Sequence, residues 1–279
     1  MNLTFLILYE LLLCLFALLA VPKTIYAVLF QKKYRKSLLA RFGFPYPAFK
    51  KNSLPSIWIH SVSVGETKAV VALAKELKQQ FPNNPLIIST TTETGQAEAK
   101  RSLPFADYHV YLPFDFAWVI APIIKQAAPA LVILCESDFW YNFLYYAKKQ
   151  KASIVLVNGK LSEQSMKRFK IVSFFTHSLF SFFDLLCVQN LLYKERLINI
   201  GLNSEKLVVT GNLKLDEHYP QLSKNETMEW RQKLGINLDE VVLTIGSSHS
   251  PEEQLFIDAL KEVWKQTPHL RVLLVPRHP

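Results

Sequence analysis

From residue 54 onward, short apolar runs alternate with amphipathic segments, and this alternation limits the fold more than any other feature of the chain. The run "SIWIH" at 56–60 precedes a helical pattern at 66–81, where Ala72, Leu73 and Leu77 recur near one face. The run "PALVILC" at 129–135 is apolar throughout, which is typical of strands buried on both faces of a parallel sheet. We therefore predict an α/β protein with a doubly wound sheet, built from right-handed β–α–β units.

The alternation is interrupted once, and the interruption divides the chain. Residues 54–216 read as a complete Rossmann-like domain, and the polar residues 217–238 read as a linker. Residues 239–279 then begin a second Rossmann-like unit with one strand, one helix and one more strand. Two strands and a helix rarely form a stable domain by themselves, so we expect this second unit to be incomplete.

The first 22 residues predict a transmembrane anchor. The run "LTFLILYELLLCLFALLAV" at 3–21 is close to the roughly 20 apolar residues that a spanning helix needs, and it lacks the features of a cleaved signal peptide. Glu10 costs about 2.5–3.5 kcal/mol on insertion scales, which the many leucines and phenylalanines offset. A helix that lies in the membrane interface, or that docks on another protein, stays open as an alternative.

Residues 23–53 are basic and rich in aromatic side chains, as in a segment at the level of lipid headgroups. By the positive-inside rule, the bases after the anchor keep the rest of the chain in the cytoplasm. The net charge of +9 indicates an anionic partner, such as acidic lipid headgroups or a phosphate-bearing substrate. Nucleic acid is not expected, because the charge gathers beside the anchor rather than on a recognition helix.

The three cysteines, Cys14, Cys135 and Cys187, are far apart in the sequence and lie in apolar runs. They form no CxxC pair and no Cys/His ligand spacing. We therefore expect neither a disulfide framework nor a metal site.

Polar side chains follow the predicted strands, at the edge where open α/β sheets bind their ligands. Ser63, Gly65 and Glu66 follow the first strand, Glu136 follows the apolar strand at 129–135, and Lys214 follows the last. Carboxylates, hydroxyls and a lysine that meet in one crevice suit a general base, stabilisation of an anion and binding of sugar hydroxyls.

Each of these residues also has a purely structural interpretation. Glu66 at a helix N-terminus gains about 0.3–1 kcal/mol from the helix dipole alone, so cap and base both stay open. Glu136 favours a site role, because an unpaired buried acid is costly. Lys214 could be a solvated turn lysine, His60 a core histidine, and Asp115 the N-cap of the helix that follows it.

An aromatic cluster after residue 173 also allows two interpretations. Its members could belong to the core, or they could form a membrane-contact face beside the bases at 167–170. We favour membrane contact. The cluster comprises Phe174, Phe175, Phe180, Phe182 and Phe183.

Six stretches together resemble one family. "HSVSVGE", "ESDFWYN", "NGKLS", "VTGNLKLD", "GSSHSPEE" and "VPRHP" match, in this order, the motifs of the 3-deoxy-D-manno-octulosonic acid (Kdo) transferases. The resemblance implies a GT-B fold and an inverting glycosyltransferase anchored in the inner membrane. Such an enzyme moves Kdo from CMP-Kdo to the lipid A precursor in lipopolysaccharide synthesis, with no metal and no cofactor besides the donor substrate.

The resemblance also implies a role for individual residues. Glu66 would be the general base that takes the proton from the acceptor hydroxyl, with Ser63 and Gly65 shaping the acceptor side. Glu136 and Lys214 would stabilise the transition state. In the second unit, the donor side of the cleft and the start of the CMP site would be formed by Ser247, His249, Pro276, Arg277 and His278.

The chain departs from the family pattern in two ways. "ESDFWYN" stands where the family usually has "ETELWPN", so Asp138, Phe139 and Tyr141 replace Glu, Leu and Pro, and Lys160 stands where Arg is common. The family's donor lobe also continues well past "PRHP". We therefore expect a complete acceptor half and a donor half that is mostly absent.

Three interpretations remain open. The chain is a Kdo transferase or a truncated portion of one. Alternatively, it is an inactive anchored fragment that only binds the lipid acceptor, or a half that requires a separately encoded donor lobe as its partner. A third interpretation is another GT-B transferase with a different nucleotide sugar. Binding of CMP separates the first two interpretations, and donor specificity separates the first from the third.

Overall fold

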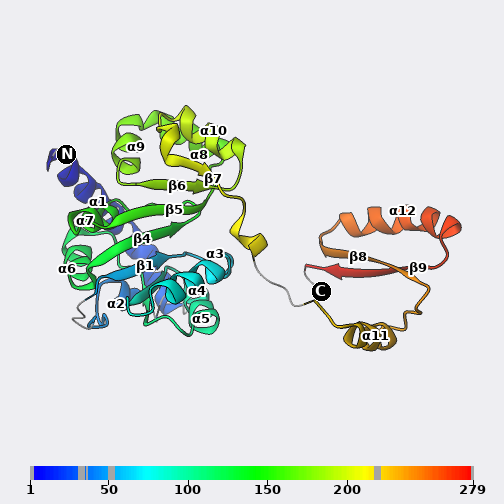
Figure 1. The fold of residues 1–279 in the computed structure, drawn as a ribbon. Helices are drawn as coiled ribbons and strands as arrows, with labels where there is room; N and C mark the ends of the chain where they lie inside the picture. Colours follow the sequence, from blue (N-terminus) through cyan, green and yellow to red (C-terminus); the bar gives the residue numbers. More distant parts are fainter. Residues whose placement is uncertain (1–2, 31–34, 36, 50–53, 217–220, 278–279) are drawn as a thin grey trace. The chain divides into compact units, whose positions relative to one another are not determined.

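The computed structural model describes residues 3–30, 35, 37–49, 54–216 and 221–277. By its contacts the chain separates into two compact units, Met1–His218 and Tyr219–Pro279 (Figure 1). The predicted residue His278 lies outside the described part of the chain.

A seven-stranded parallel sheet forms the centre of the first unit, in the order β3-β2-β1-β4-β5-β6-β7. Strand order reverses between β1 and β4, which makes this the topological switch point of a doubly wound fold. The predicted α/β class is therefore confirmed. The strands are β1 Ser56–His60, β2 Leu86–Thr90, β3 Tyr108–Tyr111, β4 Pro129–Cys135, β5 Ser153–Gly159, β6 Leu185–Val188 and β7 Leu207–Val209.

Helices cover both faces of the sheet because the central strands bury side chains on both faces. Along β1, Trp58 joins one hydrophobic core while Ile57 and Ile59 join the other. Buried residues of α6, α7 and α9 complete the core on the Trp58 side, and those of α4 and α5 complete the opposite core. The helices are α3 Val64–Ala69, α4 Val71–Gln80, α5 Glu93–Ser102, α6 Ala117–Ala127, α7 Tyr141–Lys149, α8 Glu163–Ile171, α9 Ser173–Phe180 and α10 Leu191–Asn199.

The second unit holds a parallel pair of strands, β8 Val241–Ser248 and β9 Leu270–Pro276, joined by α12 Glu252–Gln266. It also holds α11 Lys224–Lys233, which lies within the segment predicted to be a linker. A capping box explains this helix, because the Ser223 hydroxyl accepts from the Glu226 backbone N–H and the Glu226 carboxylate accepts from the Ser223 backbone N–H.

The aromatic cluster after residue 173 divides between core and surface. Phe180, Phe182 and Phe183 are buried, Phe175 is half-buried, and Phe174 is 70 % exposed. Membrane contact as the role of the whole cluster is therefore wrong, since three of its rings are part of the core that α9 covers. Phe174 and Ile171 are both exposed.

The N-terminal helix α1, Leu3–Leu29, continues beyond the predicted anchor, and only 6 % of its most apolar window is buried, on the face that lies towards the rest of the first unit. From Leu6 to Leu29 it is long and apolar enough to cross a membrane, with a mean hydropathy of 2.2. One face of it, at helical spacing, is half-buried or buried against the domain, from Leu6 and Tyr9 through Leu13 and Ala17 to Thr24 and Ala27. That face extends roughly 30 Å at 1.5 Å per residue.

Two polar side chains fasten α1 to the domain. Glu10 accepts hydrogen bonds from the Ala117 backbone N–H at 2.8 Å and from Asn142 Nδ2 at 2.5 Å. The Tyr9 hydroxyl donates to Asp115 Oδ2 at 2.8 Å. Glu10 therefore caps α6 rather than standing unpartnered among lipid tails.

Asp115 was expected to cap α6, and this prediction is wrong. Its carboxylate instead accepts from the backbone N–H groups of Asn142 and Phe143, each at 2.8 Å, in the first turn of α7. Each helix is thus capped by a residue distant in the sequence: Asp115, which precedes α6, caps α7, and Glu10 of α1 caps α6.

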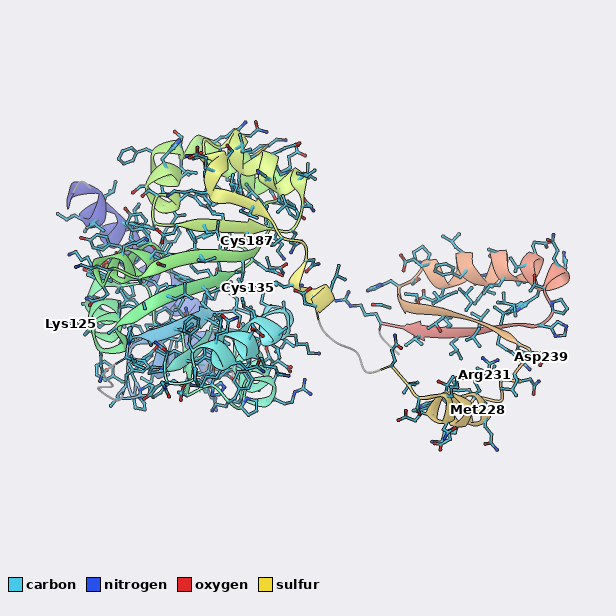
Figure 2. All side chains as sticks on the ribbon, in the orientation of Figure 1. Lys125, Cys135, Cys187, Met228, Arg231 and Asp239 are labelled. Carbon is cyan, nitrogen blue, oxygen red and sulfur yellow. The ribbon has the colours of Figure 1, made fainter. Side chains whose placement is uncertain are left out.

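The three cysteines are separate in the structure. Cys14 is exposed on α1, Cys135 is buried at the end of β4, and Cys187 is half-buried on β6 (Figure 2). None of them is paired with another within the described residues.

Candidate active site

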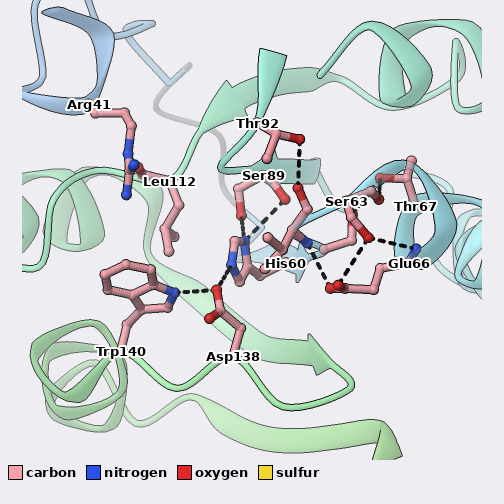
Figure 3. Close-up of polar contacts among 12 residues, drawn as sticks. Arg41, His60, Ser63, Glu66, Thr67, Ser89, Thr92, Leu112, Asp138 and Trp140 are labelled. Carbon is pink, nitrogen blue, oxygen red and sulfur yellow. Dashed lines mark hydrogen bonds and ion pairs between the residues drawn. The ribbon is translucent and has the colours of Figure 1, made fainter. Parts of the chain in front are cut away.

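Glu66 lies in the first turn of α3, immediately outside the carboxyl end of β1. Ser63 is the N-cap of this helix, and its hydroxyl accepts from the Glu66 N–H at 3.4 Å. The Glu66 carboxylate accepts from the Val62 N–H at 2.8 Å and from the Ser63 hydroxyl at 3.1 Å (Figure 3). Glu66 thus performs a capping function, and its half-buried carboxylate is also held in one orientation.

The surroundings of Glu66 favour its protonated form. Burial raises the pKa of Glu66 above its ordinary value, and the nearby Glu136 carboxylate adds to the rise. The hydrogen bonds from Val62 and Ser63 oppose the rise but do not cancel it. A raised pKa suits a carboxylate that must accept a proton near neutral pH.

Glu136 directly follows β4, which pairs with β1 at the switch point of the sheet. Its side chain is almost fully buried, at 5 % exposure. Two lysines pair with it: Lys214 Nζ lies 3.2 Å from Oε1, and Lys160 Nζ contacts Oε2. This pairing raises the pKa of Lys160. Two ammonium groups thus face the Glu136 carboxylate, so these three side chains together carry one excess positive charge at the carboxyl edge of the sheet, which suits an anionic ligand.

The backbone at this point is strained. Glu136 has φ of 67° and Asn158, at the end of β5, has φ of 54°, both in the left-handed region that glycine favours. Asn158 donates from Nδ2 to Glu136 at 3.4 Å and accepts from the Leu213 N–H at 3.1 Å. Asn158 therefore ties the Glu136 carboxylate to the turn that carries Lys214, which lies in the 3₁₀ turn Leu213–Asp216.

Lys214 connects the two halves of the site. A Cβ atom built on Gly65 would lie 3.9 Å from Lys214 Nζ, so the ammonium group stands directly over the turn that carries Glu66. The structure thus brings Ser63, Gly65, Glu66, Glu136 and Lys214 together at the carboxyl edge of the sheet, as the sequence predicted. Their roles in catalysis stay predictions.

A second polar network borders Glu66. His60, the last residue of β1, is fully buried, with Nδ1 at 2.9 Å from Ser89 Oγ and Nε2 at 3.3 Å from Asp138 Oδ2. The indole of Trp140 also donates to Asp138, at 2.7 Å. Burial alone would raise the pKa of Asp138, but the contacts with His60 and Trp140 and the charge of Arg41 outweigh it and lower that pKa.

The neighbouring turn holds the Glu66 turn in place. Thr92, the N-cap of α5, donates from its hydroxyl to the Val62 carbonyl at 3.0 Å. Gly95 permits this approach, because a Cβ there would meet the Val62 carbonyl at 2.9 Å and Thr92 Oγ1 at 2.8 Å. The backbone that positions Glu66 is therefore packed from two sides.

Within the second unit, four predicted donor-side residues gather at the carboxyl ends of its two strands. Ser248 pairs in register with Pro276, and the Arg277 N–H donates to the Ser248 carbonyl at 3.0 Å. Ser247 has φ of 61°, and the His249 N–H donates to Glu252 at 2.9 Å. Ser247, His249, Pro276 and Arg277 are thus close neighbours at one edge of this unit.

Sequence reasoning missed the pairing of Lys160 with Glu136 and the network of His60, Ser89 and Asp138. A signal for both existed, because Lys160 and Ser89 also lie at or just past the carboxyl ends of strands. The contacts themselves join residues far apart in the sequence, which periodicity does not encode.

Comparison with known proteins agrees with this geometry. The family described as 3-deoxy-D-manno-octulosonic-acid transferase (kdotransferase) matches residues 36–217, more than half of the chain. The chain belongs to the Kdo transferase family. The matched range contains Glu66, Glu136, Lys160 and Lys214, and therefore all the crevice residues of the first unit.

Individual relatives support the same assignment. The chain is 34 % identical over 273 residues to the 3-deoxy-D-manno-octulosonic acid transferase of Chlamydophila psittaci, covering 97 % of this chain and 62 % of that protein. It is 29 % identical over 282 residues to the enzyme of the same name in Haemophilus influenzae, covering 98 % and 62 %. The chain thus spans about three fifths of the length of these relatives.

Solved structures support the fold. UDP-GlcNAc 2-epimerase from Neisseria meningitidis superposes with a TM-score of 0.55 at 14 % identity, over 78 % of this chain and 64 % of that one. A glycosyltransferase from Rickettsia africae gives 0.53 at 12 % identity, over 80 % and 69 %. At this identity the likeness bears on the GT-B-like fold and not on the substrate.

Proposed function

We propose that this chain is the acceptor-binding half, with part of the donor half, of an enzyme that transfers Kdo from CMP-Kdo to the lipid A precursor. The observation that carries the proposal is the meeting of Glu66 with the Glu136–Lys160–Lys214 cluster at the switch point between β1 and β4. Family membership supports Kdo transfer as the reaction, and the geometry supports the roles proposed below for these residues.

In the proposed reaction Glu66 is the general base. A hydroxyl oxygen of the acceptor attacks the anomeric carbon of Kdo, its proton passes to the Glu66 carboxylate, and CMP leaves with the bonding electron pair. A direct displacement of this kind inverts the anomeric carbon. The hydrogen bonds from Val62 and Ser63 aim the carboxylate, and its raised pKa keeps the proton once it has been taken.

The Glu136 cluster supplies charge rather than a proton. The donor's carboxylate and phosphate are anionic, and the net positive charge of Lys160, Lys214 and Glu136 suits the negative charge that grows on the leaving phosphate. Glu136 fixes both ammonium groups, so they need no reorganisation when that charge develops. That the reaction needs no metal and no cofactor remains a prediction.

On the donor side, we assign Ser247, His249, Pro276 and Arg277 to the beginning of a CMP site. Their place at the carboxyl ends of β8 and β9 supports this assignment, because nucleotides bind at that edge of open α/β sheets. Arg277 would pair with the phosphate.

The chain attaches to the inner membrane through α1, with its crevice on the cytoplasmic side. We infer that α1 lies along the domain at the membrane surface instead of crossing the bilayer alone. Its docked face extends over roughly 30 Å, about the thickness of the hydrocarbon core, so a spanning α1 would hold the domain inside the bilayer. The outward side chains Leu11, Leu15 and Leu18 are exposed and suited to lipid contact.

The test is Kdo transfer from CMP-Kdo to lipid A precursor by membranes that carry this chain. Glu66→Ala should abolish formation of the product. The control is Glu76→Ala, which replaces an exposed glutamate on the adjacent helix α4 and should leave the amount of product unchanged. Full activity of the Glu66→Ala chain would refute the assignment of the base. Acceptor binding without any transfer by the unchanged chain would favour the lipid-binding interpretation.

A further inference from the structure

An apolar groove separates the middle of α1 from the domain. Its volume is about 450 Å³, within the range of pockets that hold small ligands. Leu13, Ala17 and Val21 form part of the α1 wall, and Phe42, Phe116 and Trp140 form part of the opposite wall. The lining is apolar apart from Thr24 and Asp115, so the groove suits a hydrocarbon chain rather than a sugar.

The helix α1 contacts the rest of the first unit on both sides of the groove. Tyr9 and Glu10 hold the helix to Asp115, Ala117 and Asn142 before the groove. Ala27 is buried after it. Between these points the small side chains Ala17 and Ala20 leave the space that larger residues would fill.

Positive charge stands beside the groove. The Arg41 guanidinium lies 4.3 Å from the ring centre of Phe114 and 5.8 Å from that of Trp140, and both rings line the groove. Lys23, on α1, adds an exposed ammonium group near the same part of the helix. A hydrocarbon chain attached to an anionic headgroup matches this combination.

The groove also adjoins the candidate active site. Trp140 lines the groove, and its indole donates to Asp138, which contacts His60 at the end of β1. Figure 3 shows Trp140, Asp138 and His60 leading towards the turn of Ser63 and Glu66. A lipid in the groove would therefore hold its headgroup towards the base.

We propose that this groove binds one acyl chain of the lipid acceptor. The inference rests on the proposed function and adds a subsite to it: the acceptor is recognised by a hydrocarbon chain as well as by its sugar. Holding that chain between α1 and the domain sets the depth of the headgroup, which places its hydroxyl against Glu66.

Native mass spectrometry of the 279-residue chain in detergent micelles can test this subsite. The probes are the acylated lipid A precursor and the same disaccharide stripped of its acyl chains. Ala17→Phe and Ala20→Phe fill the groove, and Leu18→Phe, on the outward face of α1, is the matched control. Both filling variants should bind the acylated lipid about tenfold more weakly, the effect of losing roughly two methylenes of buried contact.

Binding of the stripped disaccharide should be the same in all four chains, and phosphatidylglycerol should not displace the acylated lipid. Unchanged binding of the acylated lipid by both filling variants would overturn the groove and leave the proposed function standing. Displacement by equal phosphatidylglycerol would assign the groove to bulk lipid. A dimer that the filling variants abolish would assign it to a contact between copies. Failure to bind either probe would overturn the acceptor assignment and the groove together.

Discussion

The strain at Glu136 leads to a prediction about glycine and alanine. Glycine should be more stable than alanine at position 136, just after β4, and less stable than alanine at position 130, within β4. Glu136 has φ of 67°, where a side chain costs about 1–2 kcal/mol that glycine avoids. Glycine also costs roughly 0.5–1 kcal/mol in unfolded-chain entropy relative to alanine. Glu136→Gly should therefore be more stable than Glu136→Ala by about 1 kcal/mol, while both variants lack the carboxylate and neither supports transfer.

The matched position is Ala130, an exposed residue of β4 that is not among those with positive φ. There Ala130→Gly should lower stability by about 0.5–1 kcal/mol. Thermal unfolding in detergent, followed by tryptophan fluorescence, measures both pairs. For a unit of this size 1 kcal/mol corresponds to roughly 2–4 °C in Tm. If glycine were less stable than alanine at both positions, the strain at Glu136 would not be real.

Three further predictions concern the turn that carries Glu66 and the orientation of α1. Ser63→Ala removes a hydrogen bond that lowers the pKa of Glu66, so the pKa of Glu66 should rise. In a pH–rate profile, the pH at which transfer reaches half its maximum should therefore rise as well. An unshifted or lowered pH would contradict Glu66 as the base. Gly95→Ala places a Cβ 2.9 Å from the Val62 carbonyl and should cost about 1–3 kcal/mol and reduce transfer, whereas Gly246→Ala, with nothing within 4 Å, should be close to neutral in stability. A reporter that matures only in the periplasm, fused ahead of residue 1, should stay inactive if α1 lies at the cytoplasmic surface, and its activity would show that α1 crosses the membrane.

Much of the fold could be predicted because buried parallel strands have a local sequence pattern. The apolar run of β4 and the alternation of strand and helix patterns from β1 to β7 need no information from distant residues. Helices α8 and α9 were not predicted, since their bases and aromatic rings follow no clear apolar period. The capping role of Asp115 was misassigned because the helix it caps begins 26 residues later, at Tyr141, rather than at Ala117.

The candidate site could also be predicted in part. Glu66, Glu136 and Lys214 could be found because each follows a strand, and the carboxyl ends of parallel strands meet at one edge. The pairing of Glu136 with Lys160 was missed, although Lys160 directly follows β5, because the contact between the two side chains is set by the tertiary structure and not by a local pattern. Glu10 was treated as a cost of membrane insertion because its partners lie 107 and 132 residues away.

That last separation bears on how the protein is made. The α1 helix leaves the ribosome before its partners Ala117 and Asn142, which follow Glu10 by 107 and 132 residues. At 5–20 residues per second, α1 spends roughly 5–26 s without them. On the proposal that α1 binds the membrane, the bilayer would cover this apolar helix before the sheet exists. Glu10 would then cap α6 only as a late step of assembly, once Ala117 and Asn142 have been made.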